Sequence, residues 1–318
     1  MSDYDAFNGD ADGLCALLQL RLAEPRNATL VTGVKRDIAL LERIDPAGAE
    51  RVTALDISLD KNRKALRKLL DAEVEVFYCD HHFPGEIPEN PFLQALINTA
   101  SDVCTSLLIN GYLRGAYASW AVVGAFGDHL DTSAVAAARA AGLDNTTLDL
   151  SRRLGIYLNY NGYGAALEDL HFHPAELYQL LATFPSPAEF VAGAMTTFER
   201  LEAGYEDDMA LAGNLTPHWE GAASALFVLP DAAWSRRVSG VFGNALAKSH
   251  PERAHAVLTQ RPGGFLVSVR APLQDKRDAD TLCRAFETGG GRAAAAGINH
   301  LPDVDLPKFI SALADTYA

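Results

Sequence analysis

Apolar residues in the first part of the chain alternate between short runs typical of buried strands and longer stretches with helical spacing. Residues 13–22 show the helical spacing most clearly, because Leu14, Leu17, Leu18 and Leu22 fall on one side. Strands are predicted at residues 4–8, 29–32, 51–57 and 74–79, and helices at residues 13–22, 38–44 (with Asp37 as N-cap) and 59–70. This alternation predicts a parallel sheet covered by helices on both faces.

A mostly helical region follows, and after it the alternation of strands and helices returns. Helices are predicted at residues 103–112, 119–126, 132–141, 147–157, 174–183 and 187–201. Beyond an acidic, glycine-containing break, strands are predicted at 225–229, 254–259 and 264–270, helices at 231–248, 278–286 and 307–317, and a glycine turn at 289–291. We expect an α/β protein with a parallel-sheet domain at residues 1–205, helical in its second half, a linker at 206–217, and a smaller α/β domain at 218–318.

The composition is that of an ordinary globular protein with an acidic balance. The 318 residues are 48% hydrophobic and 21% charged, and the formal net charge is -14 at pH 7. This charge disfavours tight binding of long nucleic acid, but it allows small anions in a locally positive or metal-containing pocket. The cysteines are widely spaced, and neither a leader pattern nor an apolar stretch of membrane-spanning length is visible. We therefore expect a cytoplasmic protein with reduced thiols and no membrane contact.

Four clusters of acidic residues and histidines lie in order along residues 8–129, each at the end of a predicted apolar element. They are Asn8-Gly9-Asp10-Ala11-Asp12-Gly13, Leu55-Asp56-Ile57, Asp80-His81-His82 and Gly127-Asp128-His129. In open α/β sheets, ligands bind beyond the carboxyl ends of the strands. Carboxylates and imidazoles delivered there together are typical of a metal site.

Taken one at a time, the clusters have simpler interpretations. Asp10 and Asp12 suit a helix N-cap beside a turn aspartate, and Asp56 suits a cap of the next helix. Two like charges on one turn are nevertheless costly unless a cation or a helix N-terminus neutralises them. Asp128 ends a predicted helix, where the helix dipole disfavours a negative charge, so it needs a partner. The occurrence of all four clusters in order is what favours a metal site.

In this order, Asp10-Ala11-Asp12-Gly13, Asp56, Asp80-His81-His82 and Gly127-Asp128 resemble the four metal-binding motifs of the DHH phosphoesterase superfamily. The C-terminal part resembles the DHH-associated substrate-binding domain. There, Val267-Ser268-Val269-Arg270 is similar to the arginine strand, and Gly289-Gly290-Gly291-Arg292 with residues 294–297 is similar to the glycine loop. The resemblance covers nearly the whole chain, and the members that the chain resembles include oligoribonucleases and bisphosphonucleotide phosphatases.

The resemblance implies a phosphohydrolase with two metal ions, usually Mn²⁺, with Mg²⁺ or Co²⁺ as substitutes, and an active site between the domains. Hard carboxylates with one imidazole suit Mn²⁺, and two such ions can hold a hydroxide and clamp phosphoryl oxygens. By the same resemblance, the first metal has Asp10 and Asn8 as ligands, the second has Asp12, His81 and Asp128, Asp56 bridges both, and His82 contacts the scissile phosphate.

For the second domain, the resemblance implies substrate binding by Arg270, Gly289, Gly290, Gly291 and Arg292. The Arg270 guanidinium can pair bidentately with a phosphate or a carboxylate-like group. The backbone N–H groups of the three glycines can form an anion nest. A surface salt bridge is the alternative for the arginine, and a plain turn is the alternative for the glycines.

Two departures from the family pattern stand out. Ala6 stands where many members have a histidine ligand of the first metal, and Asn8 stands where some exonuclease members have a carboxylate. We therefore expect the first metal site to be weak. Arg292 stands where the glycine loop usually ends in histidine, and arginine binds phosphate but does not act as an acid or base near neutral pH. The second departure bears on the substrate more than on the reaction class.

Two further pairs of residues lie near the predicted site. Lys35 and Arg36 follow the second predicted strand; a solvated basic pair is the favoured interpretation, and contact with the substrate is the alternative. Thr105 and Ser106 lie near a helix start where the family pattern has a hydroxyl, although a hydroxyl in a first turn is usually ordinary helix chemistry. Residues 159–164 are predicted to form a polar and aromatic loop.

We expect Mn²⁺-dependent hydrolysis of a small nucleotide: a linear or cyclic dinucleotide, a short oligoribonucleotide or a 3′,5′-bisphosphonucleoside. The acidic charge favours such partners over long nucleic acid, and a homodimer is compatible with the resemblance. The alternatives are a polyphosphate or pyrophosphate hydrolase, a single-strand exonuclease, and a nucleotide-binding protein with little turnover. Ala6 and Arg292 motivate the last of these.

Overall fold

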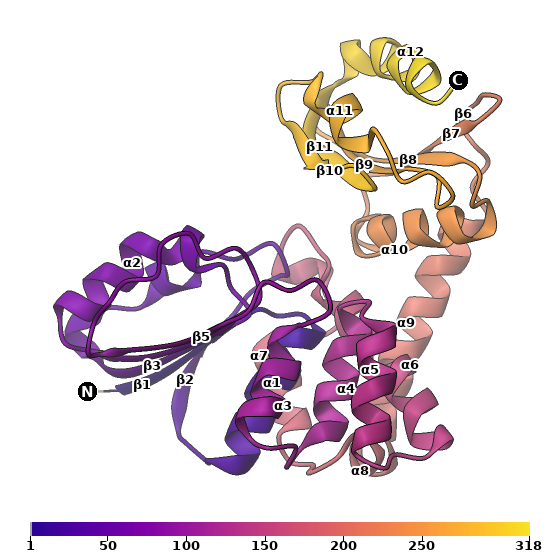
Figure 1. Ribbon diagram of the computed structural model, residues 1–318. Coiled ribbons are helices and arrows are strands. Elements are labelled where there is room, and N and C mark those ends of the chain that lie inside the picture. Colours follow the sequence, from indigo (N-terminus) through magenta and orange to yellow (C-terminus); the bar gives the residue numbers. More distant parts are fainter. Residues whose placement is uncertain (1) are drawn as a thin grey trace. The chain divides into compact units, whose positions relative to one another are not determined.

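The chain folds into two compact units, each built on its own sheet. In the computed structural model, which describes residues 2–318, the first unit extends to Ala203 and the second comprises Gly204–Ala318 (Figure 1). Helices pack on a β-sheet in both units. The predicted fold class, a parallel-sheet α/β unit with a helical region followed by a smaller α/β unit, is therefore confirmed.

The sheet of the first unit is parallel throughout, in the strand order β2-β1-β3-β4-β5. Its strands are β1 (Ser2–Phe7), β2 (Ala28–Val31), β3 (Ala49–Leu55), β4 (Glu75–Asp80) and β5 (Leu93–Ile97). The sequence pattern predicts the first four. The fifth is a half-exposed edge strand whose apolar residues do not form a continuous run. Because the strands are parallel, their carboxyl ends meet at one edge of the sheet.

Helices cover both faces of this sheet (Figure 1). On one face, α2 (Leu59–Asp71) packs through Leu59, Leu66 and Leu69 onto alternate buried residues of the strands. On the other face lie α1 (Ala11–Ala23) and α3 (Thr105–Tyr112). The alternation of side chains along each strand supplies an apolar surface to both layers.

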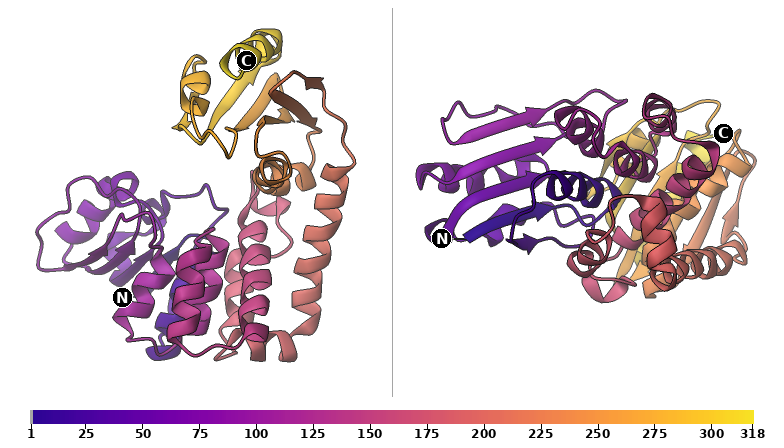
Figure 2. Two further views of the ribbon diagram at one scale, coloured as in Figure 1. Left: turned by 45° about the vertical axis from the view of Figure 1, so that its right-hand side comes forward. Right: turned by 90° about the horizontal axis from the view of Figure 1, so that it is seen from below.

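Six further helices form a layer beside the sheet, drawn from magenta to salmon in Figure 2. Two glycines of α4 permit its close packing against α3 and α1. A Cβ atom at Gly124 would lie 2.3 Å from Ser106 Oγ, and one at Gly127 would lie 2.3 Å from the Cβ of Ala11. Among residues 2–318, no helix combines the length and the apolar character needed to cross a membrane. The helices are α4 (Ala118–Gly127), α5 (Asp131–Ala140), α6 (Asn145–Gly162), α7 (Pro174–Leu181), α8 (Pro187–Gly193) and α9 (Met195–Gly213).

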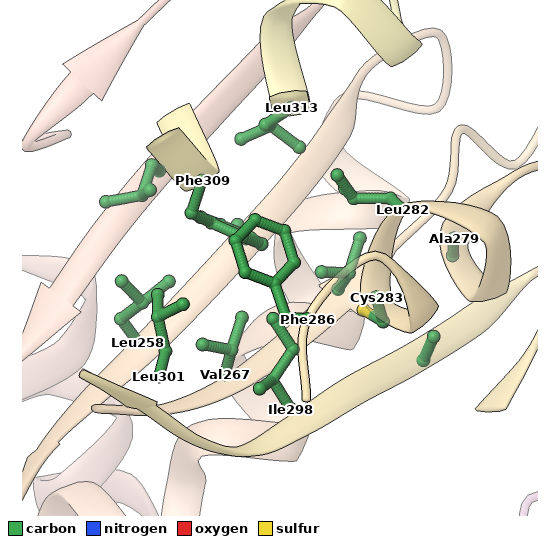
Figure 3. Close-up of a cluster of buried hydrophobic side chains, with 14 of the residues drawn as sticks. Leu258, Val267, Ala279, Leu282, Cys283, Phe286, Ile298, Leu301, Phe309 and Leu313 are labelled. Atoms are coloured by element: carbon green, nitrogen blue, oxygen red, sulfur yellow. The ribbon is translucent and has the colours of Figure 1, made fainter. Parts of the chain in front are cut away.

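The second unit has a mixed sheet in the order β10-β11-β9-β8-β7-β6, in which β7 and β8 run parallel and the other neighbours antiparallel. The strands are β6 (Trp219–Glu220), β7 (Ser224–Leu229), β8 (Ala254–Arg261), β9 (Gly264–Arg270), β10 (Gly289–Arg292) and β11 (Ala295–Pro302). Helix α10 (Ala233–Ser249) lies on one face, and α11 (Ala279–Arg284) and α12 (Leu306–Thr316) lie on the other. Phe309 and Leu313 of α12 meet Leu282 of α11 over Val267 and Ile298 (Figure 3).

Several helix predictions are wrong in detail. The segment 38–44 contains only a 3₁₀ turn, η1 (Leu40–Arg43), and Asp37 pairs with Arg43 instead of capping a helix. The segment 187–201 divides into α8 and α9 at Ala194, and α9 continues to Gly213, so residues 206–213 of the expected linker are helical. Residues 159–162 belong to α6 rather than a loop, because the Tyr160 hydroxyl is buried against His171.

The glycine run of the second unit also differs from the prediction. Gly289–Gly291 form most of the edge strand β10, paired with β11, instead of a turn. The pairing needs glycine at the first of these positions, because a Cβ at Gly289 would lie 1.7 Å from the carbonyl oxygen of Cys283. The turn lies at Ala293 and Ala294 instead.

Candidate metal centre

The four predicted clusters come together in the first unit. Asp10 follows β1, Asp56 follows β3, and Asp80 ends β4, so the parallel sheet brings all three to its carboxyl edge. Asp128 caps the C-terminal end of α4. Two sets of ligand atoms each lie within 4.8 Å of one another; the sets are Asp56, His81 and His82, and Asp12, His81 and Asp128.

The Asp12 carboxylate is held by the N-terminus of α3. Asp12 lies fully buried in the first turn of α1. Its two oxygens accept hydrogen bonds from the backbone N–H groups of Thr105, at 2.8 Å, and Ser106, at 2.7 Å. These bonds and the positive end of the α3 dipole offset the cost of burying the charge. Each oxygen keeps a second lone pair, so Asp12 can still bind a cation.

Asp56 is the most constrained carboxylate of the cluster. Its backbone is left-handed, with φ at 57°, a conformation that aspartate tolerates better than most residues and that is often found at functional sites. The backbone N–H of Asp56 donates to the Cys79 carbonyl oxygen at 3.1 Å, and the Thr105 hydroxyl donates to Oδ1 at 3.2 Å. The Thr105 hydroxyl therefore contacts the cluster directly.

His81 directs its Nε2 towards the carboxylates. Its Nδ1 lies 3.1 Å from the carbonyl oxygen of Val103 and donates to it. Its Nε2 lies 3.5 Å from Asp56 Oδ1 and 3.8 Å from Asp128 Oδ2. A hydrogen bond of this kind on the far nitrogen fixes the tautomer of metal-binding histidines.

His82 is oriented differently and is more exposed. Its Nδ1 lies 2.8 Å from Asp80 Oδ1, and its side chain is 44% exposed. The hydrogen bond to Asp80 raises the pKa of the His82 imidazole above its ordinary value. Asp80 is itself fully buried, and its Oδ2 has no hydrogen-bond partner within the described part of the chain. His82 therefore lies on the exposed side of the cluster, and Asp80 favours its protonated form.

The carboxylates of Asp56 and Asp128 lie in an environment that favours a nearby positive charge. Burial, followed by the charges of Asp12 and Asp10, raises the pKa of Asp56 well above its ordinary value. Burial and the charge of Asp12 raise the pKa of Asp128 to about 6. Burial and mutual repulsion therefore oppose ionisation of Asp56 and Asp128, and a nearby cation would favour it.

Lys35 supplies one such positive charge. Its Nζ lies 2.6 Å from Asp10 Oδ2 and 3.8 Å from Asp128 Oδ1, and it donates to Asn159 Oδ1 at 3.0 Å. Burial alone would raise the pKa of Asp10, but the charge of Lys35 leaves it below its ordinary value. Burial opposes the charge on Lys35, yet Asp10 keeps the lysine pKa well above its ordinary value. The two groups form a charged pair inside the cluster.

The sets predicted for two metals differ in how well they fit. Asp12, Asp56, His81 and Asp128 offer three carboxylates and one correctly oriented imidazole, a donor set that suits a hard divalent ion such as Mn²⁺. The set predicted for the other ion does not fit. Ala6 offers no ligand atom, Asn8 is neutral, and the Asp10 carboxylate is already paired with an ammonium group.

The residues predicted to bind substrate lie in the second unit. The Arg270 guanidinium is oriented by Asn244 Oδ1, at 2.6 Å from Nε, and by Ser268 Oγ, at 2.9 Å from Nη1. Gly289, Gly290 and Gly291 lie on the edge strand β10, which ends at Arg292 with an exposed side chain. An edge strand leaves part of its backbone N–H groups free for other acceptors.

Lys35 is the residue at which the favoured sequence interpretation is wrong, because it is not part of a solvated basic pair. Its position depends on contacts with Asp10 and Asn159, 25 and 124 residues away, which no local pattern reveals. The missing histidine at Ala6 was the one available signal, since an unbalanced carboxylate at Asp10 needs some other cation.

Comparisons with known proteins agree with this architecture. No protein-family profile matches the sequence, and no curated protein sequence is significantly similar to it. Among solved structures, RecJ from Thermus thermophilus in complex with Mn²⁺ is similar to 99% of this chain at 18% identity and a TM-score of 0.68. A second exonuclease RecJ, bound to manganese, is similar at 19% identity and a TM-score of 0.61, over 99% of this chain and 89% of that one.

A pGpG-specific phosphodiesterase, PggH from Vibrio cholerae, is similar over 99% of this chain and 98% of its own length, at 13% identity and a TM-score of 0.53. The Thermus RecJ is longer, and the present chain spans 51% of it. These structures share the DHH fold, so the resemblance drawn from the four motifs is confirmed at the level of the fold.

Proposed function

We propose that this chain is a metal-dependent phosphohydrolase that acts on short nucleotides. The observation that supports it best is the convergence of Asp12, Asp56, His81 and Asp128 in two overlapping groups of ligand atoms that share His81, on a fold found in phosphodiesterases and nucleases. The raised pKa values of Asp56 and Asp128 favour the same conclusion, because a bound cation would offset the burial and the neighbouring negative charges that raise them.

Mn²⁺ is the ion we propose, with Mg²⁺ and Co²⁺ as substitutes. Carboxylate oxygens with one imidazole suit these ions, and similar structures carry Mn²⁺ and Mg²⁺. A divalent ion held there would lower the pKa of water and polarise a phosphoryl oxygen. The remaining steps of the proposal concern the side chains of the chain itself.

His82 is proposed to contact the scissile phosphate. With Nδ1 hydrogen-bonded to Asp80, the imidazolium has its second N–H, on Nε2, available to donate to a phosphoryl or leaving-group oxygen. Its raised pKa lets that proton persist to higher pH than on an ordinary histidine. Thr105 holds Asp56 in position through its hydroxyl, and the Val103 carbonyl holds His81.

The second unit is proposed to hold the distal part of the substrate. Arg270 has a guanidinium whose orientation is set by Asn244 and Ser268, and it can pair with a terminal phosphate. Arg292 and the backbone of Gly289, Gly290 and Gly291 would add further anion contacts. A linear or cyclic dinucleotide, a short oligoribonucleotide or a 3′,5′-bisphosphonucleoside is the proposed substrate class, since the net charge of -14 disfavours long nucleic acid.

The test is product analysis of the purified protein with Mn²⁺. The panel contains a linear dinucleotide, a cyclic dinucleotide, a bisphosphonucleoside, a single-stranded oligomer and polyphosphate. Wild type and the exposed-site control Asp71→Ala should release nucleoside monophosphate from the nucleotide substrates. Asp56→Ala should release none. Preferential release of phosphate from polyphosphate would favour the polyphosphatase alternative, and tight dinucleotide binding without product would favour the binding-protein alternative.

A further inference from the structure

The position of Lys35 in the carboxylate cluster has consequences for how many metal ions the chain binds. Lys35 comes from the segment after β2, and its ammonium group lies among oxygens from three other segments. The nearest are Asp10 Oδ2 at 2.6 Å, Asn159 Oδ1 at 3.0 Å and Asp128 Oδ1 at 3.8 Å. An ammonium group offers three donors, and these oxygens are acceptors.

This placement of Lys35 is supported by its backbone as well as by its side chain. Its backbone N–H donates to the Gly162 carbonyl oxygen at 2.8 Å, and its carbonyl oxygen accepts from Asn8 Nδ2 at 3.3 Å. The Tyr163 ring centroid lies 5.4 Å from Nζ, within reach of a cation–π interaction. Backbone and side chain are thus both anchored, and the side chain is 25% exposed.

While Lys35 is present, the same region offers a divalent ion few free donor atoms. Asp10 Oδ1 accepts the N–H groups of Asp12 and Gly13 as the N-cap of α1, and its Oδ2 is paired with Lys35. Ala6 is a fully buried strand residue between Val31 and Ala54, with no ligand atom. The Oδ1 atom of Asn8 has no hydrogen-bond partner within residues 2–318, but a neutral amide oxygen alone does not replace a histidine and a carboxylate.

We propose that the Lys35 ammonium group takes the place of one of the two metal ions, so that the chain binds a single divalent ion at Asp12, Asp56, His81 and Asp128. The binding of that single ion is part of the proposed function, and the inference rests on it. Lys35 neutralises Asp10, and its proximity to Asp128 Oδ1 places it beside the proposed metal ligands. An ammonium group can donate hydrogen bonds to a phosphoryl oxygen, but it does not bind and activate water as a metal ion does. Water activation would therefore fall to the single ion, and Lys35 would contribute fixed positive charge.

Counting bound Mn²⁺ tests this inference without reference to hydrolysis. Metal-free protein is dialysed against saturating Mn²⁺, bound metal is measured by elemental analysis, and the electron paramagnetic resonance spectrum is recorded. Wild type should bind one ion per chain, with no exchange-coupled pair signal. Lys35→Arg, which keeps the cation, and Lys64→Ala, which removes an exposed lysine of α2, should do the same. Lys35→Ala should acquire a second, weaker site and a coupled signal.

The outcomes separate the inference from the proposed function. Two ions per wild-type chain, or one ion in both wild type and Lys35→Ala, would overturn the substitution of metal by Lys35 and leave the hydrolase proposal standing. No bound ion in any variant would overturn the proposed metal site itself.

Reductive methylation in the presence and absence of Mn²⁺ provides a second readout that needs no variant. Lys35 should remain protected in both states, whereas Lys64 should react in both. Mn²⁺-induced exposure of Lys35 would show that a metal displaces it, which contradicts the inference.

Discussion

The imidazole of His82 is bonded through Nδ1 to Oδ1 of the fully buried Asp80, at a distance of 2.8 Å. Asp80 and His82 belong to the same sequence cluster. Their hydrogen bond gives the adjacent histidines, His81 and His82, different roles. His81, whose Nδ1 donates to a backbone carbonyl, offers Nε2 to a metal. His82, whose Nδ1 donates to a carboxylate, has a raised pKa, which favours its protonated form. A buried carboxylate makes the imidazolium more stable than a carbonyl does.

Replacement of Asp80 should shift the pH dependence of hydrolysis. Asp80 raises the pKa of His82 above 6.5, so the imidazolium persists to higher pH in wild type. In Asp80→Asn the alkaline limb of the kcat profile should move to lower pH, with a loss on the order of 10-fold near pH 8 for each unit by which the pKa falls. The measurement is the pH–rate profile with Mn²⁺, and Asp71→Asn is the control. An unmoved alkaline limb would show that His82 does not donate a proton in the reaction.

Removal of the Asp56 charge should stabilise the metal-free protein. Asp56 is buried among other carboxylates, and its pKa is raised well above the ordinary value. Asparagine suits the left-handed backbone at φ 57° and can still accept the Thr105 hydroxyl. Asp56→Asn should therefore raise the free energy of unfolding in EDTA by about 0.5–2 kcal/mol. Denaturant unfolding measures this change.

The same variant should lose the stabilisation that Mn²⁺ confers. Wild type should gain stability with Mn²⁺ concentration, because the ion binds the folded chain, and Asp56→Asn should gain little. Equal gains in both proteins would place the metal elsewhere.

Protons should compete with the metal below about pH 6, where Asp128 becomes protonated in the metal-free fold. A bound ion needs the carboxylate, so the affinity for Mn²⁺ should fall by up to about 10-fold per pH unit below this value. Binding at pH 5.5 should release more protons than binding at pH 7.5. Calorimetric titrations in buffers of different ionisation enthalpy measure this release. Proton release that does not vary with pH would contradict the raised pKa of Asp128.

Acid should destabilise the second unit through His255 in β8. Burial lowers the pKa of this 1% exposed histidine to about 4. Between pH 6.5 and 4 the unfolded chain binds the additional proton, so stability is complete above pH 6.5 and falls as the pH decreases to 4. The loss should reach about 3 kcal/mol.

Unfolding monitored across this pH range, with two histidine variants, isolates the effect. His255→Leu should remove this component of the pH dependence, and the exposed-site variant His218→Leu should retain it. A similar pH dependence in wild type and His255→Leu would assign the acid sensitivity to other groups.

The strands and motifs of the first unit could be predicted because their signals are local. Each cluster follows an apolar run, and parallel strands deliver their ends to one edge whatever the remaining contacts. The prediction failed where long-range pairing overrides local preference. β5 is a half-exposed edge strand, and Gly289–Gly291 form a strand through pairing with β11 despite the low strand preference of glycine. Cys283 leaves no room for a side chain at Gly289.

Within the candidate site, ligand types could be predicted and charge balance could not. Asp56 and His81 follow directly from their motifs. The Lys35 position requires the segment after β2 to pack on the C-terminal end of α6, where Gly162 accepts its N–H. The effect of having Ala6 in place of a histidine can therefore be seen only in the folded chain, where Lys35 pairs with Asp10.

The most direct test of the proposed hydrolase is dinucleotide cleavage in ¹⁸O-labelled water, followed by mass spectrometry of the products. Wild type with Mn²⁺ should release mononucleotide with one ¹⁸O atom in its phosphate, and EDTA or Asp56→Ala should abolish this product. Absence of labelled product from wild type across the substrate panel, or equal labelling by Asp56→Ala, would contradict the assignment of this cluster as a hydrolytic metal centre.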